Sequence, residues 1–156
     1  MNKFIIATLL VVGVAAGGAL LMRGASSSTP AKGLAVVHKS ASCGCCGVYA
    51  TYLKREGYDV DVHNTSDSGL SEKKRELGVP NELESCHTSE VGGYIVEGHV
   101  PEEAIAKLLA EKPDIKGIGM AGMPQGSPGM GGGKSGPFVI YEIENDGTQG
   151  GVFVTL

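Results

Sequence analysis

The feature that most constrains this chain is a strand–helix–strand pattern with three cysteines at the start of its helix. Residues 34–38 form a short apolar run that suits a buried strand, and residues 58–62 alternate as a second strand does. Residues 48–56 between them predict a helix that Gly57 ends. This order predicts a βαβ unit with parallel strands. The cysteines that precede the helix are Cys43, Cys45 and Cys46.

The remainder of the chain extends this unit into an α/β domain. Residues 71–77 predict a short exposed helix with Ser71 as its N-cap, and residues 93–97 predict a strand. Pro101 suits the first turn of a helix over residues 102–111. The chain ends with a predicted hairpin whose parts are strands at 138–143 and 151–156 and a turn at 145–147.

The order of these elements is β-α-β-α-β-α-β-β, which is close to a thioredoxin-like fold. Between the last helix and the final hairpin lies a Gly/Met/Pro-rich segment, residues 116–137. Its apolar residues follow neither a helical nor a strand period, so we expect a long inserted loop there. The fold prediction is therefore a thioredoxin-like α/β domain with a Gly/Met-rich loop insertion.

The N-terminus precedes this domain and has the pattern of an export signal. Lys3 is followed by an uncharged apolar run over residues 4–21, which Arg23 ends. The run is about long enough to span a bilayer, so a cleaved signal peptide and a retained membrane anchor both remain open. We therefore assign residues 1–23 to the signal peptide or anchor, 24–33 to a linker and 34–156 to the domain. Either interpretation places the domain outside the cytoplasm.

The charge of the chain limits its partners. The formal net charge is −4, and no basic stripe is present in the sequence. Nucleic acid is therefore not an expected partner. Contact with a membrane is expected only through the N-terminal segment, if that segment is retained.

The four cysteines are gathered rather than spread, which favours metal chemistry over structural disulfides. Cys43, Cys45 and Cys46 share one helix start, where the helix dipole favours thiolates. Cys86 is the remaining cysteine, and we expect a thioredoxin-like fold to bring it to the same site. Thiolates select soft metals such as Cu(I), Zn(II) or iron–sulfur centres. Cys43 and Cys46 also form a C-x-x-C pair, the redox position of such a fold.

Four further side chains are auxiliary candidates for the same site. His87 follows Cys86 directly and is a ligand, a supporting donor or a solvated loop residue, the last being the preferred interpretation. Thioethers at Met120, Met123 and Met130 lie in the Gly/Met-rich loop, as donors or as part of a lid. Zinc prefers Cys and His, so three methionines beside four cysteines favour copper. The two histidines near strand ends, His38 and His99, are expected to be structural.

Several motifs together resemble those of the CopG-like bacterial copper-resistance family, long catalogued as a domain of unknown function. The motifs are Cys43-Gly44-Cys45-Cys46, Ser85-Cys86-His87-Thr88, Gly93-Tyr94 with Glu97-Gly98-His99-Val100-Pro101, and Gly122-Met123-Pro124 with Gly126-Ser127-Pro128-Gly129-Met130. The resemblance implies a periplasmic, thioredoxin-like protein whose four cysteines hold a multinuclear, thiolate-bridged copper cluster.

The sequence therefore predicts a periplasmic copper-resistance protein that binds Cu(I) through Cys43, Cys45, Cys46 and Cys86. Cycling between Cu(I) and Cu(II), and exchange of copper with other periplasmic copper-handling proteins, are compatible with this interpretation. A thiol–disulfide oxidoreductase that uses Cys43 and Cys46 is the first alternative, so enzymatic activity stays open. A zinc-stabilised adaptor domain is the second alternative.

Overall fold

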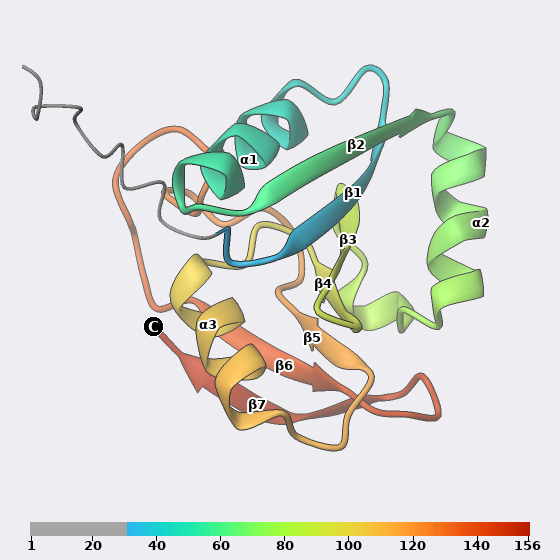
Figure 1. Ribbon diagram of the computed structural model, residues 1–156, viewed down its shortest axis with the longest axis vertical. Helices are drawn as coiled ribbons and strands as arrows, with labels where there is room; N and C mark the ends of the chain where they lie inside the picture. Colours follow the sequence, from blue (N-terminus) through green and yellow to red (C-terminus); the bar gives the residue numbers. More distant parts are fainter. Residues whose placement is uncertain (1–30) are drawn as a thin grey trace, which may run out of the picture.

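A seven-stranded mixed sheet organises the chain in the computed structural model, which describes residues 31–156 (Figure 1). The strand order is β2-β1-β3-β4-β5-β6-β7. The strands are β1 (Leu34–Ser40), β2 (Asp59–Thr65), β3 (His87–Val91), β4 (Tyr94–Glu97), β5 (Gly117–Gly119), β6 (Val139–Ile143) and β7 (Gln149–Thr155). The helices are α1 (Gly44–Arg55), α2 (Asp67–Leu77) and α3 (Glu102–Glu111), with a short 3₁₀ turn at Asn81–Leu83. The α/β class predicted from the sequence is confirmed.

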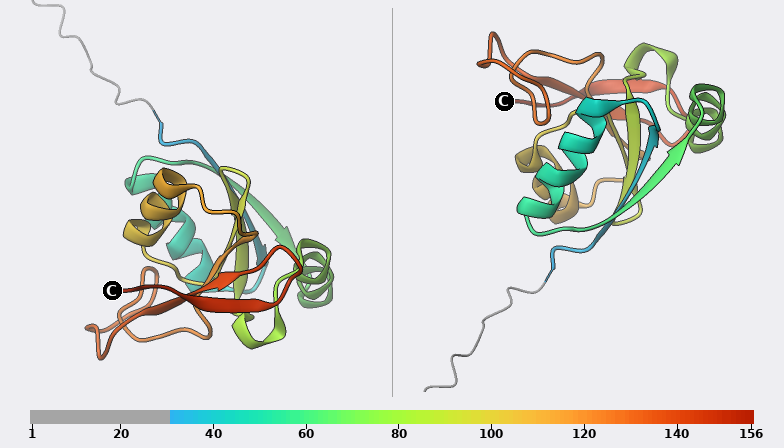
Figure 2. Two further views of the ribbon diagram at one scale, coloured as in Figure 1. Left: turned by 90° about the horizontal axis from the view of Figure 1, so that it is seen from below. Right: turned by 90° about the horizontal axis from the view of Figure 1, so that it is seen from above.

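The first four strands form the half of the sheet that positions the cysteines. β1 pairs in parallel with β2 and antiparallel with β3, and β3 pairs antiparallel with β4. Viewed along the sheet, α1 and α3 lie on one side and α2 on the other (Figure 2). The predicted βαβ unit is therefore present, with β3 inserted beside β1. β5 to β7 extend the sheet beyond β4.

Two strands that the sequence analysis did not predict complete this sheet. β3 was missed because His87, Thr88, Ser89 and Glu90 give it a polar sequence, although most of it is buried. β5 lies inside the segment predicted to be a loop. It consists of Ile118 between two glycines and pairs with β4 and β6, so neighbouring strands rather than intrinsic propensity make it extended.

Helix α2 begins one turn earlier than predicted. Its N-cap is Ser66, whose hydroxyl accepts a hydrogen bond from the backbone N–H of Gly69, so the assignment of Ser71 as N-cap is wrong. The acidic Asp67 in the first turn favours the same start. The helix ends at Gly78, which adopts a left-handed conformation with φ of 74°.

Apolar side chains fill both sides of the sheet. The larger cluster joins α1 and α3 to the sheet, with Tyr49, Leu53, Ile105 and Leu108 all fully buried. A smaller cluster on the other side contains Val79, Leu83, Ile95 and Ile143. None of the helices described in residues 31–156 is long and apolar enough to cross a membrane. The export segment predicted over residues 1–23 lies outside the described residues.

Close packing of β5 against β4 gives a test of this sheet. A Cβ atom at Gly117 would lie 2.1 Å from the Ile95 carbonyl oxygen, so Gly117→Ala forces two backbones apart. We expect the free energy of unfolding to fall by about 1–3 kcal/mol, measured by urea denaturation. The matched control is Gly131→Ala, because a Cβ there meets nothing within 4 Å. Equal stability of the two variants would contradict the packing.

Candidate metal centre

Three of the four cysteines lie where β1 leads into α1. Cys43 is the N-cap residue of α1 and makes no side-chain capping hydrogen bond, while Cys45 and Cys46 lie in the first turn. Unpaired backbone N–H groups and the positive end of the helix dipole surround all three sulfurs. The structure thus places these three cysteines at the helix start that the sequence analysis predicted.

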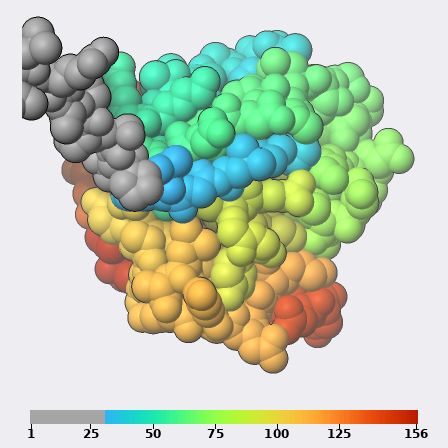
Figure 3. Space-filling model, in the orientation of Figure 1, coloured from blue at the N-terminus to red at the C-terminus, as the bar shows by residue number. Residues whose placement is uncertain are grey.

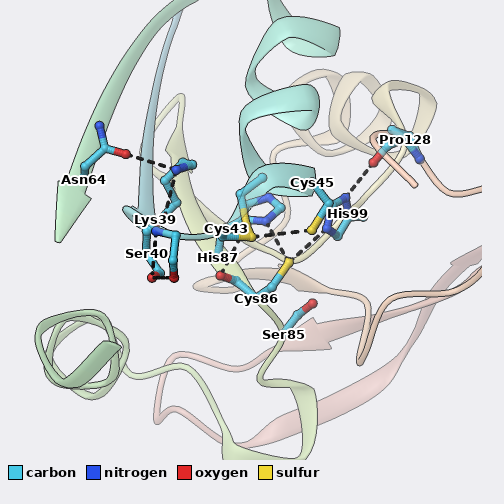
Figure 4. The surroundings of a disulfide bond; sticks show 12 residues. Lys39, Ser40, Cys43, Cys45, Asn64, Ser85, Cys86, His87, His99 and Pro128 are labelled. Carbon is cyan, nitrogen blue, oxygen red and sulfur yellow. Dashed lines mark hydrogen bonds between the residues drawn. A yellow bond between two sulfur atoms is a disulfide. The ribbon is translucent and has the colours of Figure 1, made fainter. Parts of the chain in front are cut away.

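The fourth cysteine, Cys86, lies in the segment between the 3₁₀ turn and β3. It immediately precedes β3 and lies beside Cys43 and Cys45 (Figure 4). Its backbone carbonyl lies 3.5 Å from the Cys46 sulfur. The sulfur atoms of Cys43 and Cys45 are 3.4 Å apart. All four sulfurs lie within 4.8 Å of one another, which is close enough to share metal ions.

Cys43 and Cys46 are joined by a disulfide bond, and Cys45 and Cys86 are free. The bonded pair is the C-x-x-C pair of the sequence. In this oxidised form the site offers two thiols. Reduction by two electrons and two protons would free two more and give four sulfur ligands.

His99 is the site residue that the sequence analysis missed. Its Nε2 atom lies 2.9 Å from the Cys86 sulfur, and its Nδ1 atom lies 2.6 Å from the Pro128 carbonyl oxygen. A carbonyl only accepts hydrogen bonds, so Nδ1 carries the proton and Nε2 presents its lone pair to the sulfur. A neutral imidazole oriented in this way is prepared to bind metal beside a thiolate. The Glu97-Gly98-His99 motif was the available signal.

His87 is buried, so the preferred interpretation of a solvated loop histidine is wrong. It begins β3, packs against the Tyr49 ring at 4.5 Å between ring centres, and lies 3.4 Å from the Cys86 sulfur through Nδ1. Its Nε2 atom is buried without a hydrogen-bond partner. Burial, with a contribution from His99, lowers the pKa of His87 to about 3, so it is neutral at pH 7.

Cys86, His87 and His99 therefore form a second set of converging donors that shares Cys86 with the first. Tyr49 holds the two imidazoles from the α1 side, and its hydroxyl donates a hydrogen bond to the Val100 carbonyl. Burial and the neighbouring Cys45 raise the pKa of the Cys86 thiol to about 11. A metal ion that displaces the proton would supply the positive charge that the thiolate lacks here.

The Gly/Met-rich loop passes over the start of α1. A Cβ atom at Gly129 would lie 2.9 Å from both the Cys45 carbonyl oxygen and the Tyr49 backbone nitrogen, so only glycine allows this approach. Ser85 ties the other end of the loop through a hydrogen bond to the Gly122 carbonyl. These contacts are those expected of a lid.

The three methionines of the loop differ in environment. Met120 is 2 % exposed and belongs to the main apolar core, which favours a packing role. Met123 is half exposed, and Met130 is partly buried directly after Gly129. The three thioethers are therefore not grouped at one place. Met130 directly follows Gly129, the residue that contacts the turn with the cysteines.

A buried ion pair fixes the segment that carries Cys86. The Lys74 ammonium on α2 lies 2.5 Å from the Glu97 carboxylate on β4, and both side chains are almost fully buried. Lys74 also donates to the Ser85 carbonyl, while Glu97 accepts from the Ser85 backbone N–H at 2.6 Å. Both backbone polar groups of Ser85 are thus bound by one ion pair. A polar cavity of about 310 Å³ between Lys74, Cys43 and Cys86 adjoins it.

The fold and this site define a mixed α/β protein with a cluster of thiols and imidazoles at a helix N-terminus that could hold a metal ion. Comparison with known proteins identifies the family. A family model described as a protein of unknown function, DUF411, matches residues 83–130. Two solved structures, forms 1 and 2 of copper resistance protein CopG, are each 37 % identical with a TM-score of 0.71. The alignments cover 81 % and 79 % of this chain and 98 % and 97 % of those chains.

No curated protein sequence matches the chain. The identity and coverage of the two solved structures show that the chain belongs to the CopG family, as the four sequence motifs predicted.

The buried ion pair predicts a large difference between neighbouring lysines of α2. Lys74→Met leaves the Glu97 carboxylate buried and unpaired, and we expect the free energy of unfolding to fall by about 3–5 kcal/mol. Lys73→Met removes only exposed pairs with Glu76 and Glu90 and should cost less than about 1 kcal/mol. Urea denaturation of both variants measures the difference. Similar losses would show that the buried pair is not the stabilising contact.

The raised pKa of Cys86 predicts slow alkylation of the metal-free protein. With a pKa of about 11, only about one thiol in 1,000 is ionised at pH 8, about 100-fold fewer than for a thiol with a pKa of 9.0. The rate of reaction with iodoacetamide at Cys86, followed by peptide mass spectrometry, should rise with pH through pH 10. N-acetylcysteine is the control. A rate that levels off below pH 9 would contradict this environment.

Proposed function

We propose that this protein binds copper as cargo, holding Cu(I) on the thiolates of Cys43, Cys45, Cys46 and Cys86. The observation that carries the proposal is the convergence of four sulfurs within 4.8 Å at a helix N-terminus. Two solved structures of the same family are named copper resistance proteins, which supports copper as the metal.

The arrangement of the sulfurs supports a multinuclear centre in the reduced protein. Cys43, Cys45 and Cys46 share one turn of backbone, so their thiolates would repel one another at short distance. Metal ions that each contact several sulfurs neutralise this charge. No carboxylate belongs to either group of converging donors among residues 31–156, and soft sulfur with imidazole suits Cu(I). We place His99 and His87 as nitrogen donors beside Cys86, with Met123 and Met130 as auxiliary thioethers.

The Cys43–Cys46 disulfide supports a link between copper and redox chemistry. Two Cu(II) ions can each take one electron from the Cys43 and Cys46 thiolates, which gives two Cu(I) ions and one disulfide. In the reverse direction, two Cu(I) ions would supply the two electrons that reopen it. We propose this exchange as the basis of Cu(I)/Cu(II) cycling, with Cys45, Cys86 and the histidines retaining copper in the oxidised form.

A thiol–disulfide oxidoreductase is the alternative that the same disulfide favours. Its reactive pair would be Cys43 and Cys46 at the start of α1, and Cys45 would be dispensable. A Cys45→Ser variant separates the two functions. It should retain disulfide exchange in an insulin-reduction assay if the protein is an oxidoreductase, and lose copper if the thiolates share a cluster.

The arrangement of β1 to β4 supports the thioredoxin-like interpretation of residues 34–156. β1 and β2 are parallel with α1 between them, and β3, β4 and α3 follow in the order that this fold requires. We propose that residues 1–23 direct the domain to the periplasm and that residues 24–33 link the two. Other periplasmic copper-handling proteins would then deliver or receive the metal.

Anaerobic titration of reduced residues 31–156 with Cu(I) tests the proposed function. We expect several copper ions per chain, with luminescence from shielded copper–thiolate bonds, and loss of both after alkylation of the thiols. Each single Cys→Ser variant at positions 43, 45, 46 and 86 should lose most of the copper, because shared ligands act as a unit.

The control for this titration is Ser42→Ala, which changes a hydroxyl beside the cysteines without removing sulfur. It should bind as much copper as the wild type. Full copper stoichiometry in all four cysteine variants would exclude a shared cluster. Binding of one weak equivalent, together with activity in the insulin assay, would favour the oxidoreductase.

A further inference from the structure

Two histidines face each other on the side of the sheet that carries α2. The parallel register of β1 and β2 pairs His38 with His63. Their rings are 5.1 Å apart between centres and nearly perpendicular. β1 and β2 run side by side on the face seen in Figure 3, with α2 to the right. The next pair along β1 and β3, Lys39 and His87, points to the α1 side, where His87 meets Tyr49.

Each of these histidines is held by a carboxylate through Nε2. His38 Nε2 lies 2.8 Å from a Glu90 carboxylate oxygen, and His63 Nε2 lies 2.9 Å from an Asp61 carboxylate oxygen. A carboxylate accepts the Nε2 proton and leaves the lone pair of a neutral ring on Nδ1. Neither Nδ1 atom has a hydrogen-bond partner among residues 31–156. Neither belongs to the buried polar atoms that lack a partner. The carboxylate–histidine pairing is the one that commonly orients metal-binding imidazoles.

The spacing of the two rings fits a shared metal ion. A metal 2.0 Å from one nitrogen of each ring, at bond angles between square and tetrahedral, places the ring centres about 4.5–5.1 Å apart. The observed 5.1 Å lies at the upper end of this range. Both strands of the pair are regular here, so the separation follows from the backbone register.

A surface pocket of about 400 Å³ opens beside the two rings and carries more acidic than basic side chains. His38 and His63 line it together with residues of α2, among them Glu72 and Glu76. Lys73 also lines it, and its ammonium lies 3.5 Å from Glu76 and 3.9 Å from Glu90. The lining carboxylates of Glu72 and Glu76 outnumber this one ammonium, and Asp61 and Glu90, the partners of the two histidines, lie nearby. The excess of carboxylates favours a cation in this pocket.

We propose that His38 and His63 form a separate binding site for a divalent metal ion, with Cu(II) as the preferred ion. Imidazole nitrogen and carboxylate oxygen suit Cu(II), which lies at the top of the affinity order of divalent first-row metals. The site holds no sulfur, so it differs in chemistry from the cysteine centre and binds copper in its oxidised form. Asp61 and Glu90 orient the two ligands. The assignment does not depend on copper binding by the cysteines.

Electron paramagnetic resonance with Cu(II) tests this site in the full chain. The Cys45→Ser/Cys86→Ser/His99→Gln background keeps the Cys43–Cys46 disulfide, has no free thiol to reduce the ion and lacks the imidazole that lies beside Cys86. We expect one Cu(II) per chain with hyperfine splitting from two nitrogens. His38→Gln or His63→Asn in this background should remove one nitrogen from the spectrum and raise the Kd for Cu(II) at least tenfold.

Two aspartates of β2 provide the matched comparison. Asp61→Asn removes the partner of His63 and should raise the Kd by about tenfold, as loss of an orienting carboxylate typically does. Asp59→Asn removes the same charge two residues away and should leave the Kd unchanged. Unchanged Cu(II) affinity in both histidine variants, or equal effects of the two aspartate variants, would overturn the proposal.

Discussion

The buried ion pair between Lys74 and Glu97 is the interaction on which the position of the fourth cysteine depends. It joins α2 to β4 across the polar segment that precedes β3. Burial of two opposite charges is unfavourable, and hydrogen bonds to surrounding groups offset part of that penalty, here through Glu97 Oε1 while Oε2 has no partner. The peptide of Ser85 supplies two of those bonds, one to each charge. The ion pair and the Ser85 backbone therefore stabilise each other, and Ser85 is followed directly by Cys86.

The remainder of the centre is organised from the opposite direction by α1. β1 delivers three cysteines to the helix start, and Tyr49, one turn further on, packs against the imidazoles of His87 and His99. Burial lowers the pKa of both histidines, which keeps them neutral. It also raises the pKa of Cys86. The metal-free site is therefore an uncharged set of donors around Cys86, and a bound cation is what would make its thiolate stable.

Sequence patterns predicted the parts of this structure that rest on local rules. The βαβ unit, the helix over residues 102–111 and the terminal hairpin follow from apolar period, caps and turn residues, and the spacing of the cysteines indicated a shared site. β3 and β5 escaped prediction because strand pairing imposes them on a polar sequence and on a Gly-Ile-Gly triplet. The position of His99 beside Cys86 was not predicted, for a similar reason. Its proximity to Cys86 results from the pairing of β3 with β4, which no local pattern encodes.

The contact of Gly129 with the first turn of α1 also has a consequence for how the protein matures. The covering loop lies more than 70 residues after the cysteine turn in the sequence, and its close approach requires the finished turn as a template. Cys43, Cys45 and Cys46 precede residues 120–136 in the chain, so the helix start that carries them can form before the loop covers it. A state in which the loop has not docked would leave these thiols more open to a metal donor or an oxidant than the folded protein does.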